Sequence, residues 1–366
     1  MTSKKEPITN PRREFLLEVV NVDQLKGLEI GPLTDPLIVT EDLQGQGEIF
    51  YLDHLSTDEL KEKYADDCSV DVKKIIPVDI VCRDGDLVAA IAEYKFDYVV
   101  ASHVIEHVPN LLQFLQDVEK TIRPGGRLIL IIPDKRFTFD LNRPITSFGS
   151  VLEKYRNKET KPSLSAVYDH FALANGTNAH HIWFGVVSPE DKRLLASEQF
   201  AWKAAQSVLN EGAYFDVHVN IFTPASFFEI LRKAISHNLV GFEVEKFRDT
   251  AVGQIEFMVS LKKTEKNSAD NASSKSLTTI PTLPLDSLLS PYMPQIKQLS
   301  GALDKVTETN GNLHNEVQQL RDRSARESAE RLKIETELIQ AQKVLNRRSV
   351  RFALSFVDKI CSRFLK

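Results

Sequence analysis

The stretch KGLEIGP, residues Lys26 to Pro32, marks the point where a strand ends and a ligand site is expected to begin. Its apolar residues are typical of a buried strand, and Gly31-Pro32 interrupts them where a parallel sheet passes into its first helix. A second expected strand, Glu48 to Leu52, ends in Asp53. In an open α/β sheet, an acid at that strand end accepts hydrogen bonds from ribose hydroxyls. The two strand ends therefore predict a site for a nucleoside-containing ligand.

The turn after the first strand excludes one class of nucleoside ligand. A dinucleotide fold needs G-x-G-x-x-G for the pyrophosphate, and this turn holds a single glycine, Gly31. A nicotinamide dehydrogenase is therefore the poorer interpretation. Glu29, two residues before Gly31, suits a ligand that carries an ammonium and a sulfonium group. We therefore expect S-adenosylmethionine as the cofactor.

Four segments, in chain order, resemble the successive motifs of class I S-adenosylmethionine-dependent methyltransferases. They are Glu29 to Pro32, Asp53, Phe96 to Val108 and Arg123 to Leu130. The resemblance covers roughly residues 1–264, although the family's usual extra glycine after the first turn is missing. It implies cofactor contacts from Glu29, Gly31, Pro32, Asp53, Asp84, Ala101 and Ser102. Glu29 and Gly31 would border the methionine part, Asp53 the ribose and Asp84 the adenine, with Asp79 and Asp86 as rivals for the last role.

The remaining pattern up to about Lys263 is that of an α/β fold with a parallel sheet. Strand-like apolar runs alternate with helical segments, which is typical of a sheet with helices on both faces. Helices are expected at 111–122 and 225–235. The seven expected strands are Gly27 to Ile30, Ile49 to Asp53, Val78 to Val81, Tyr98 to Ser102, Arg127 to Ile132, Val240 to Phe247 and Ile255 to Leu261. The prediction is thus a seven-stranded Rossmann-like sheet.

A helical insertion, about 134–221, separates the fifth and sixth expected strands and is rich in aromatic residues and histidine. Ligands of such sheets bind outside the carboxyl ends of the strands, and the insertion leaves from one of these ends. We therefore expect it to form the acceptor pocket. The alternative is that its aromatic side chains are the core of a small helical cap.

Methyl transfer to a hydroxyl requires near-attack geometry and a base for the hydroxyl proton. His103 follows the fourth strand and is the first candidate, because an imidazole titrates near neutral pH. His180 and His181 in the insertion are the other candidates. His107 is interpreted as a packing and capping residue. A metal site from His170, His180 and Asp169 matches no familiar ligand spacing, so no metal is predicted.

The chain changes character after residue 264. Residues 265–294 are first polar and then proline-containing, which is typical of a linker. Residues 295–346 keep an apolar heptad pattern that predicts a coiled coil, with Asn310 at an a position favouring a parallel dimer. A single solvated helix is the alternative. We expect a homodimer or higher oligomer.

The last segment, 347–366, predicts a basic amphipathic helix. Its apolar residues share one helical face, and its cations outnumber its single acid, Asp358. Such helices lie in membrane interfaces. Tails of this kind resemble those of many bacterial cell-surface polysaccharide enzymes. The alternative is a helix that caps the coiled coil or docks on the sheet domain.

Composition limits the remaining function classes. The net charge of −5 disfavours nucleic acid as a partner. Three widely spaced cysteines match neither a disulfide framework nor a zinc cluster, and no segment resembles a signal peptide or a spanning helix. We expect a cytoplasmic enzyme, peripheral on the inner face of the membrane, that methylates a hydroxyl of a cell-surface glycan sugar. The alternatives are a methyltransferase for a small metabolite or a protein, and a coiled-coil scaffold without activity.

Overall fold

The computed structural model describes residues 10–264 except 84, 93, 177, 185 and 187, together with 276–283, Phe352 and 355–359. The chain divides into two units, 1–296 and 297–366. In the second unit, 355–359 is helical and Phe356 and Val357 are half exposed. The expected coiled coil and most of the basic tail lie outside the described residues. No helix in the described part of the chain is long and apolar enough to span a bilayer.

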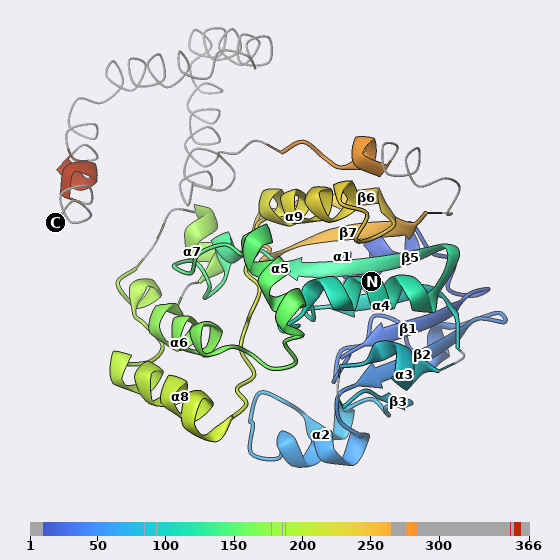
Figure 1. Ribbon diagram of the computed structural model, residues 1–366, viewed down its shortest axis with the longest axis horizontal. Coiled ribbons are helices and arrows are strands. Elements are labelled where there is room, and N and C mark those ends of the chain that lie inside the picture. The colour runs from blue at the N-terminus through green and yellow to red at the C-terminus, as the bar shows by residue number, and fades with distance from the viewer. Residues whose placement is uncertain are drawn as a thin grey trace, which may run out of the picture. The chain divides into compact units, whose positions relative to one another are not determined.

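A seven-stranded sheet with the order β3-β2-β1-β4-β5-β7-β6 forms the centre of the first unit (Figure 1). β1 to β5 are parallel, and β7 runs antiparallel to both β5 and β6. The Rossmann-like sheet predicted from the sequence is thus confirmed. β5 begins earlier than expected, because the Pro-Gly-Gly segment that ends the preceding helix already belongs to the strand. The strands are β1 (Lys26–Ile30), β2 (Glu48–Asp53), β3 (Ile80–Val81), β4 (Phe96–Ser102), β5 (Ile122–Pro133), β6 (Phe242–Arg248) and β7 (Glu256–Lys263).

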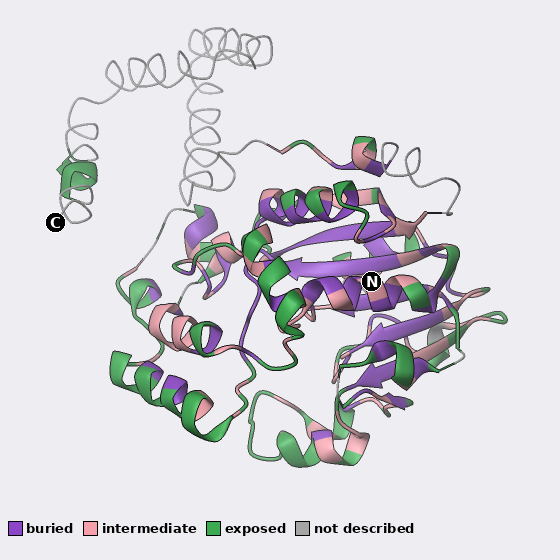
Figure 2. Ribbon diagram, in the orientation of Figure 1, coloured by how far each residue is buried: buried purple, intermediate pink, exposed green. Residues whose placement is uncertain are grey.

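Apolar side chains project from both faces of the sheet, and different helices cover each face. In β4, Val99 and Ala101 join the larger core, whereas Tyr98 and Val100 join a second core on the opposite face, as the two-residue period of a strand requires. Figure 2 shows the strands as an almost continuous buried layer. The larger core packs against α3 (Leu87–Ile91), α4 (Leu111–Thr121) and α9 (Pro224–Ser236), and the smaller core against α1 (Pro11–Leu17).

Local capping fixes where several of these helices begin. Asn110 accepts a hydrogen bond from Gln113 N–H at the start of α4. Thr223 and Ser226 form a capping box at α9, with Pro224 in its first turn. Ser56 and Glu59 cap α2 (Thr57–Lys63) in the same way.

Residues 134–223 form the helical insertion between β5 and α9. α6 and α8 lie side by side and share a small core with Val217 and Val219 (Figure 1). The segment after α8 returns to the sheet, where Val219 N–H and Asn220 N–H both donate to the backbone oxygen of Glu106. The insertion is thereby fixed beside the loop that follows β4. Its helices are α5 (Phe148–Asn157), α6 (Leu164–Leu173), α7 (Ala179–Phe184) and α8 (Glu198–Glu211).

Part of the segment expected to be a linker packs on the sheet domain. Residues 276–283 lie against α9 and β6, with Ile280 only 5% exposed within the larger core. Val244 N–H donates to Thr279 Oγ1 at 2.8 Å. The expectation that the whole of 265–294 is a spacer is therefore corrected for these eight residues: the threonine and apolar side chains of this stretch find partners on the domain.

Candidate active site

A cleft of about 890 Å³ opens at the carboxyl ends of β1, β2 and β4. Gly31, Asp53 and His103, which follow or end these three strands, all line it. This is the position in which open α/β sheets bind their ligands. The structure therefore brings these three strand ends together around one cavity, as the sequence predicts.

Gly31 provides the close approach of backbone to the cleft. Its φ is +64°, in the left-handed region that favours glycine, and its N–H donates to Leu52 O at 2.8 Å. Leu33 and His103, which also line the cleft, have φ of +46° and +54°. The turn after β1 therefore contains a single glycine, because the second residue with a positive φ in this turn is Leu33. Pro32 is buried and does not line the cleft.

Asp53 ends β2 with its carboxylate at the cleft. The residue is 7% exposed, and its Oδ1 accepts a hydrogen bond from His54 N–H at 2.7 Å. The same oxygen lies 2.6 Å from His54 Nδ1. These contacts fix the side chain through one oxygen. Gly31 and Asp53 together fit the backbone and sugar of a nucleoside cofactor.

Glu29 does not take the role expected of it. Its carboxylate is buried and accepts hydrogen bonds from Leu37 N–H at 2.8 and 3.1 Å and from Ile38 N–H at 3.5 Å. It does not line the cleft. Burial raises the pKa of Glu29 to about 7, against the opposing effect of these N–H groups. The carboxylate therefore organises the loop after β1 instead of contacting the cofactor's ammonium group.

The three acids proposed for the adenine end differ in where the structure places them relative to the cleft. Asp84 lies outside the described residues. Asp86 lines the cleft, and its carboxylate accepts from Ala89 N–H at 3.0 Å as the cap of α3. Asp79 instead accepts from Tyr51 N–H at 2.9 Å and does not line the cleft. Ala101 is fully buried and Ser102 half-buried, and neither side chain is part of the lining.

His103 lines the cleft, but its ring is already paired. Nε2 lies 2.6 Å from Glu256 Oε2, and Nδ1 lies 3.5 Å from Glu106 Oε1. Arg12 binds the same Glu256 carboxylate at 2.6 and 2.8 Å. Both ring nitrogens thus face carboxylates, which favours a positioned imidazole over a free proton acceptor.

His180 and His181 are not in the cleft. Both belong to α7, where Nδ1 of His181 lies 2.7 Å from Asp191 Oδ2 and His180 packs beside Phe184. Nearby, Phe137 stacks on Trp183 with ring centroids 4.1 Å apart in a small core. This part of the insertion is a packed cap, as in the alternative interpretation, and the two histidines are not placed to take a proton in the cleft.

Two histidines that were not among the predicted site residues lie at the cleft wall and behind it. His107 lines the cleft, and its Nδ1 lies 2.9 Å from Asp216 Oδ1. Burial lowers the pKa of His107, but Asp216 and Glu106 outweigh it and the pKa is raised. His218 is buried, with Nδ1 2.5 Å from Asp140 Oδ2. His107 lies in the loop before α4, which begins at Leu111.

The segment after α8, which returns to the sheet, carries a sequence pattern that indicates this group of polar side chains. Tyr214, Asp216 and His218 alternate with Phe215 and Val217, a strand-like pattern that places the polar residues on one side. Tyr214 and Asp216 line the cleft. The pairing with residues of the β4–α4 loop carries no sequence signal, because it depends on how the insertion folds back.

The cleft continues beyond the cofactor residues along a polar wall. Asn110 and Gln113 contribute from the start of α4, and Lys158, Glu159 and Thr160 from the end of α5. Lys63 of α2 reaches Asp216 at 3.3 Å. The wall offers hydrogen-bond donors and acceptors to a ligand that is itself polar.

A family model described as "Methyltransferase domain" matches residues 14–234, more than half of the chain. No curated protein matches the chain.

Several solved structures are similar in fold. A putative S-adenosylmethionine-dependent methyltransferase from Listeria monocytogenes is 12% identical, with a TM-score of 0.38 over 69% of this chain and 98% of that one. A methyltransferase from Methanosarcina mazei is 15% identical, with a TM-score of 0.36 over 70% and 99%. A putative zinc-dependent alcohol dehydrogenase from Rhodobacter sphaeroides is 16% identical, with a TM-score of 0.39 over 70% and 91%.

Proposed function

Because the chain belongs to the methyltransferase domain family, we propose that its cleft brings the methyl group of S-adenosylmethionine to a hydroxyl of a sugar. The enzyme is a methyltransferase with S-adenosylmethionine as its donor. When bound, this donor supplies a methyl group on a positively charged sulfur. The residues that would hold it are Gly31, through its exposed backbone, and Asp53, through the ribose.

The observation that carries the hydroxyl assignment is the polar wall beyond Asp53 and His103. Asn110, Gln113, Glu159, Tyr214 and Asp216 present amide, carboxylate and phenol groups to the same cleft. Groups of this kind form hydrogen bonds with a ligand that carries many hydroxyls.

The glycan part of the proposal is supported by the C-terminal sequence. A coiled coil would link two or more copies, and the basic tail would hold them at an anionic membrane surface, where lipid-linked glycans are found. Each cation contributes about 1 kcal/mol near such a surface, so attachment would be reversible. The enzyme would then work as a peripheral protein of the inner membrane face.

Incubation of the full chain with methyl-labelled S-adenosylmethionine and a lipid-linked glycan tests this function. We expect label in the glycan that resists mild alkali, because a methyl ether is stable where a methyl ester is hydrolysed. Asp53→Ala should reduce the labelling about 10- to 100-fold when the donor concentration is below its dissociation constant. Label found only in protein or in free metabolites, or released by alkali, would contradict the sugar hydroxyl as acceptor.

A scaffold without activity is distinguished by calorimetry on the same protein. Heat of binding with S-adenosylmethionine that is weakened in Asp53→Ala supports the enzyme. Absence of binding in the folded wild-type chain would contradict it.

A further inference from the structure

Glu106 is a buried carboxylate that accepts no hydrogen bond from the described residues, although His103 Nδ1 lies 3.5 Å from its Oε1. The residue is 1% exposed, and neither of its carboxyl oxygens accepts a hydrogen bond from any described residue. A carboxylate taken out of water without compensation costs several kcal/mol or more. Its backbone oxygen accepts hydrogen bonds from Val219 N–H and Asn220 N–H at 2.6 and 3.0 Å, and these bonds hold the residue in its buried position. The position calls for a positive partner.

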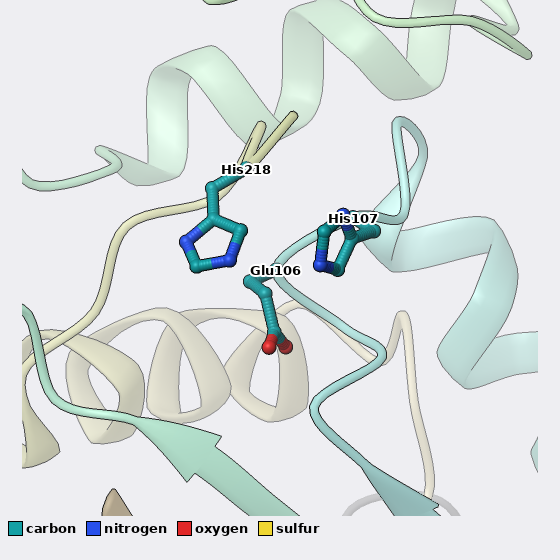
Figure 3. A group of neighbouring side chains, drawn as sticks. All are labelled: Glu106, His107 and His218. Atoms are coloured by element: carbon teal, nitrogen blue, oxygen red, sulfur yellow. The ribbon is translucent and has the colours of Figure 1, made fainter. Parts of the chain in front are cut away.

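Two imidazoles face this carboxylate. Figure 3 shows the rings of His107 and His218 on either side of Glu106. One ligand atom from each of the three residues lies within 4.8 Å of the other two. Two ligands of one ion, each about 2.1 Å from it, lie at most about 4.2 Å apart, so a contraction of a few tenths of an ångström completes the site.

The outer contacts of both imidazoles are those of metal ligands. Nδ1 of His107 is held by Asp216 and Nδ1 of His218 by Asp140. A histidine that binds a metal through one nitrogen commonly donates its other N–H to a carboxylate, which fixes the ring and raises its basicity. Asp140 is itself anchored by Arg143 at 2.8 Å. The two nitrogens left for a ligand are therefore Nε2 of each ring.

We propose that Glu106, His107 and His218 bind a divalent transition-metal cation behind the part of the cleft wall that His107 forms. Two imidazoles and one carboxylate suit Zn²⁺, Mn²⁺, Fe²⁺ or Co²⁺ better than Mg²⁺, which prefers oxygen ligands and water. His107 lines the cleft, and His103, whose Nδ1 lies 3.5 Å from Glu106 Oε1, lines it too. The ion is thus reachable from the cleft.

The ion's role rests on the proposed function, whereas its binding does not. A bound cation lowers the pKa of a coordinated hydroxyl and fixes its oxygen. The oxygen then forms the new O–C bond, the donor's C–S bond breaks with its electron pair on sulfur, and the hydroxyl proton leaves to water in the cleft. This role accounts for the absence of a free imidazole base at His103.

Metal binding to the full chain, without a histidine tag and after treatment with a chelator, tests the proposal. The probes are Co²⁺ alone, followed by its visible absorption, and Zn²⁺ alone in equilibrium dialysis. We expect one ion per wild-type chain. Glu106→Gln and His107→Ala should weaken binding by at least about 10-fold. His181→Ala is the matched control, since it removes another carboxylate-paired imidazole from outside the cleft, and it should bind as the wild type does.

Binding of S-adenosylmethionine, measured by calorimetry on each variant, shows that the fold is intact. Because no acceptor is present, a wrong acceptor assignment leaves this result untouched. The proposal is overturned if the folded wild type binds no stoichiometric ion. It is also overturned if Glu106→Gln and His107→Ala bind the ion as tightly as the wild type.

Discussion

Nδ1 of His107 lies 2.9 Å from Oδ1 of Asp216, an ion pair that joins the loop after β4 to the segment that returns from the insertion. Asn220 strengthens the same junction, with its amide donating to Ile105 O at 2.9 Å and Val108 O at 2.7 Å. The loop that begins with His103 and the segment that returns from the insertion are therefore one continuous wall of the cleft. Donor and acceptor can be held in a fixed relation because this wall is braced.

Replacement of Asp216 by Asn tests whether this pair serves the acceptor side alone. The substitution keeps the shape but removes the charge that orients His107. We expect methyl transfer to fall about 10- to 100-fold, while the affinity for S-adenosylmethionine is unchanged. Rates and calorimetry should be compared with Asp66→Asn, an exposed acid away from the cleft. A parallel loss of cofactor affinity would contradict the division of the cleft.

Asp53→Ala should weaken cofactor binding specifically. Hydrogen bonds to a charged group contribute about 1.5–3 kcal/mol, so the dissociation constant should rise about 10- to 100-fold. Calorimetry with S-adenosylmethionine measures it, with Asp66→Ala as the control. An unchanged dissociation constant would show that the ribose is bound elsewhere.

Glu29→Gln should remove a pH dependence of stability. The folded pKa of Glu29 is about 7, above the ordinary value of 4.5, so the folded state holds the proton more tightly between these values. The wild-type contribution is present below pH 4.5 and is lost as pH rises through 7. Relative to Glu29→Gln, the wild type should lose up to about 3 kcal/mol of unfolding free energy between pH 4.5 and 8. Urea unfolding at several pH values measures this, and the exposed Glu62→Gln should keep the wild-type slope.

Gly27→Ala should destabilise the sheet although it adds only a methyl group. A Cβ at residue 27 would lie 2.1 Å from Cζ of Tyr98, inside the second core. Overpacking of this kind costs about 1–3 kcal/mol. The same change at Gly149, exposed in α5 with no atom nearer than 3.8 Å, should be neutral or stabilising by up to about 1 kcal/mol. Thermal unfolding of both variants measures the two effects. Equal effects of the two substitutions would contradict the prediction that only Gly27 is overpacked.

Ile280→Ala tests whether residues 276–283 belong to the sheet domain. Its burial beside α9 predicts a loss of about 2 kcal/mol or more in unfolding free energy. The exposed neighbour provides the control as Thr282→Ala, which should have almost no effect. No difference between the two variants would mean that the stretch behaves as a spacer after all.

The sheet was predictable from the sequence because each strand corresponds to a local pattern of apolar residues. Apolar runs that end in Gly31, Asp53 and His103 fix both the strands and the edge where the cleft opens. The roles of single side chains were less predictable. Glu29 has the expected position in the strand, but its oxygens are taken by the N–H groups of a loop whose path the sequence does not state.

The group around Glu106 could not be assembled from sequence at all. His107 and His218 are far apart in the chain, and only the return of the insertion brings them together. The same lack of long-range information made His180 and His181 candidates for the base, although neither lines the cleft. Spacing along the chain predicts neighbours on one element, but not which elements meet.

A crystal structure of the full chain with S-adenosylmethionine tests the central claim most directly. We predict the ribose hydroxyls against the carboxylate of Asp53, the methionine part along the backbone at Gly31, and the methyl group facing the wall formed by His103 and His107. A cofactor bound elsewhere, or a ribose turned away from Asp53, would contradict the assignment of this cleft as the site of methyl transfer.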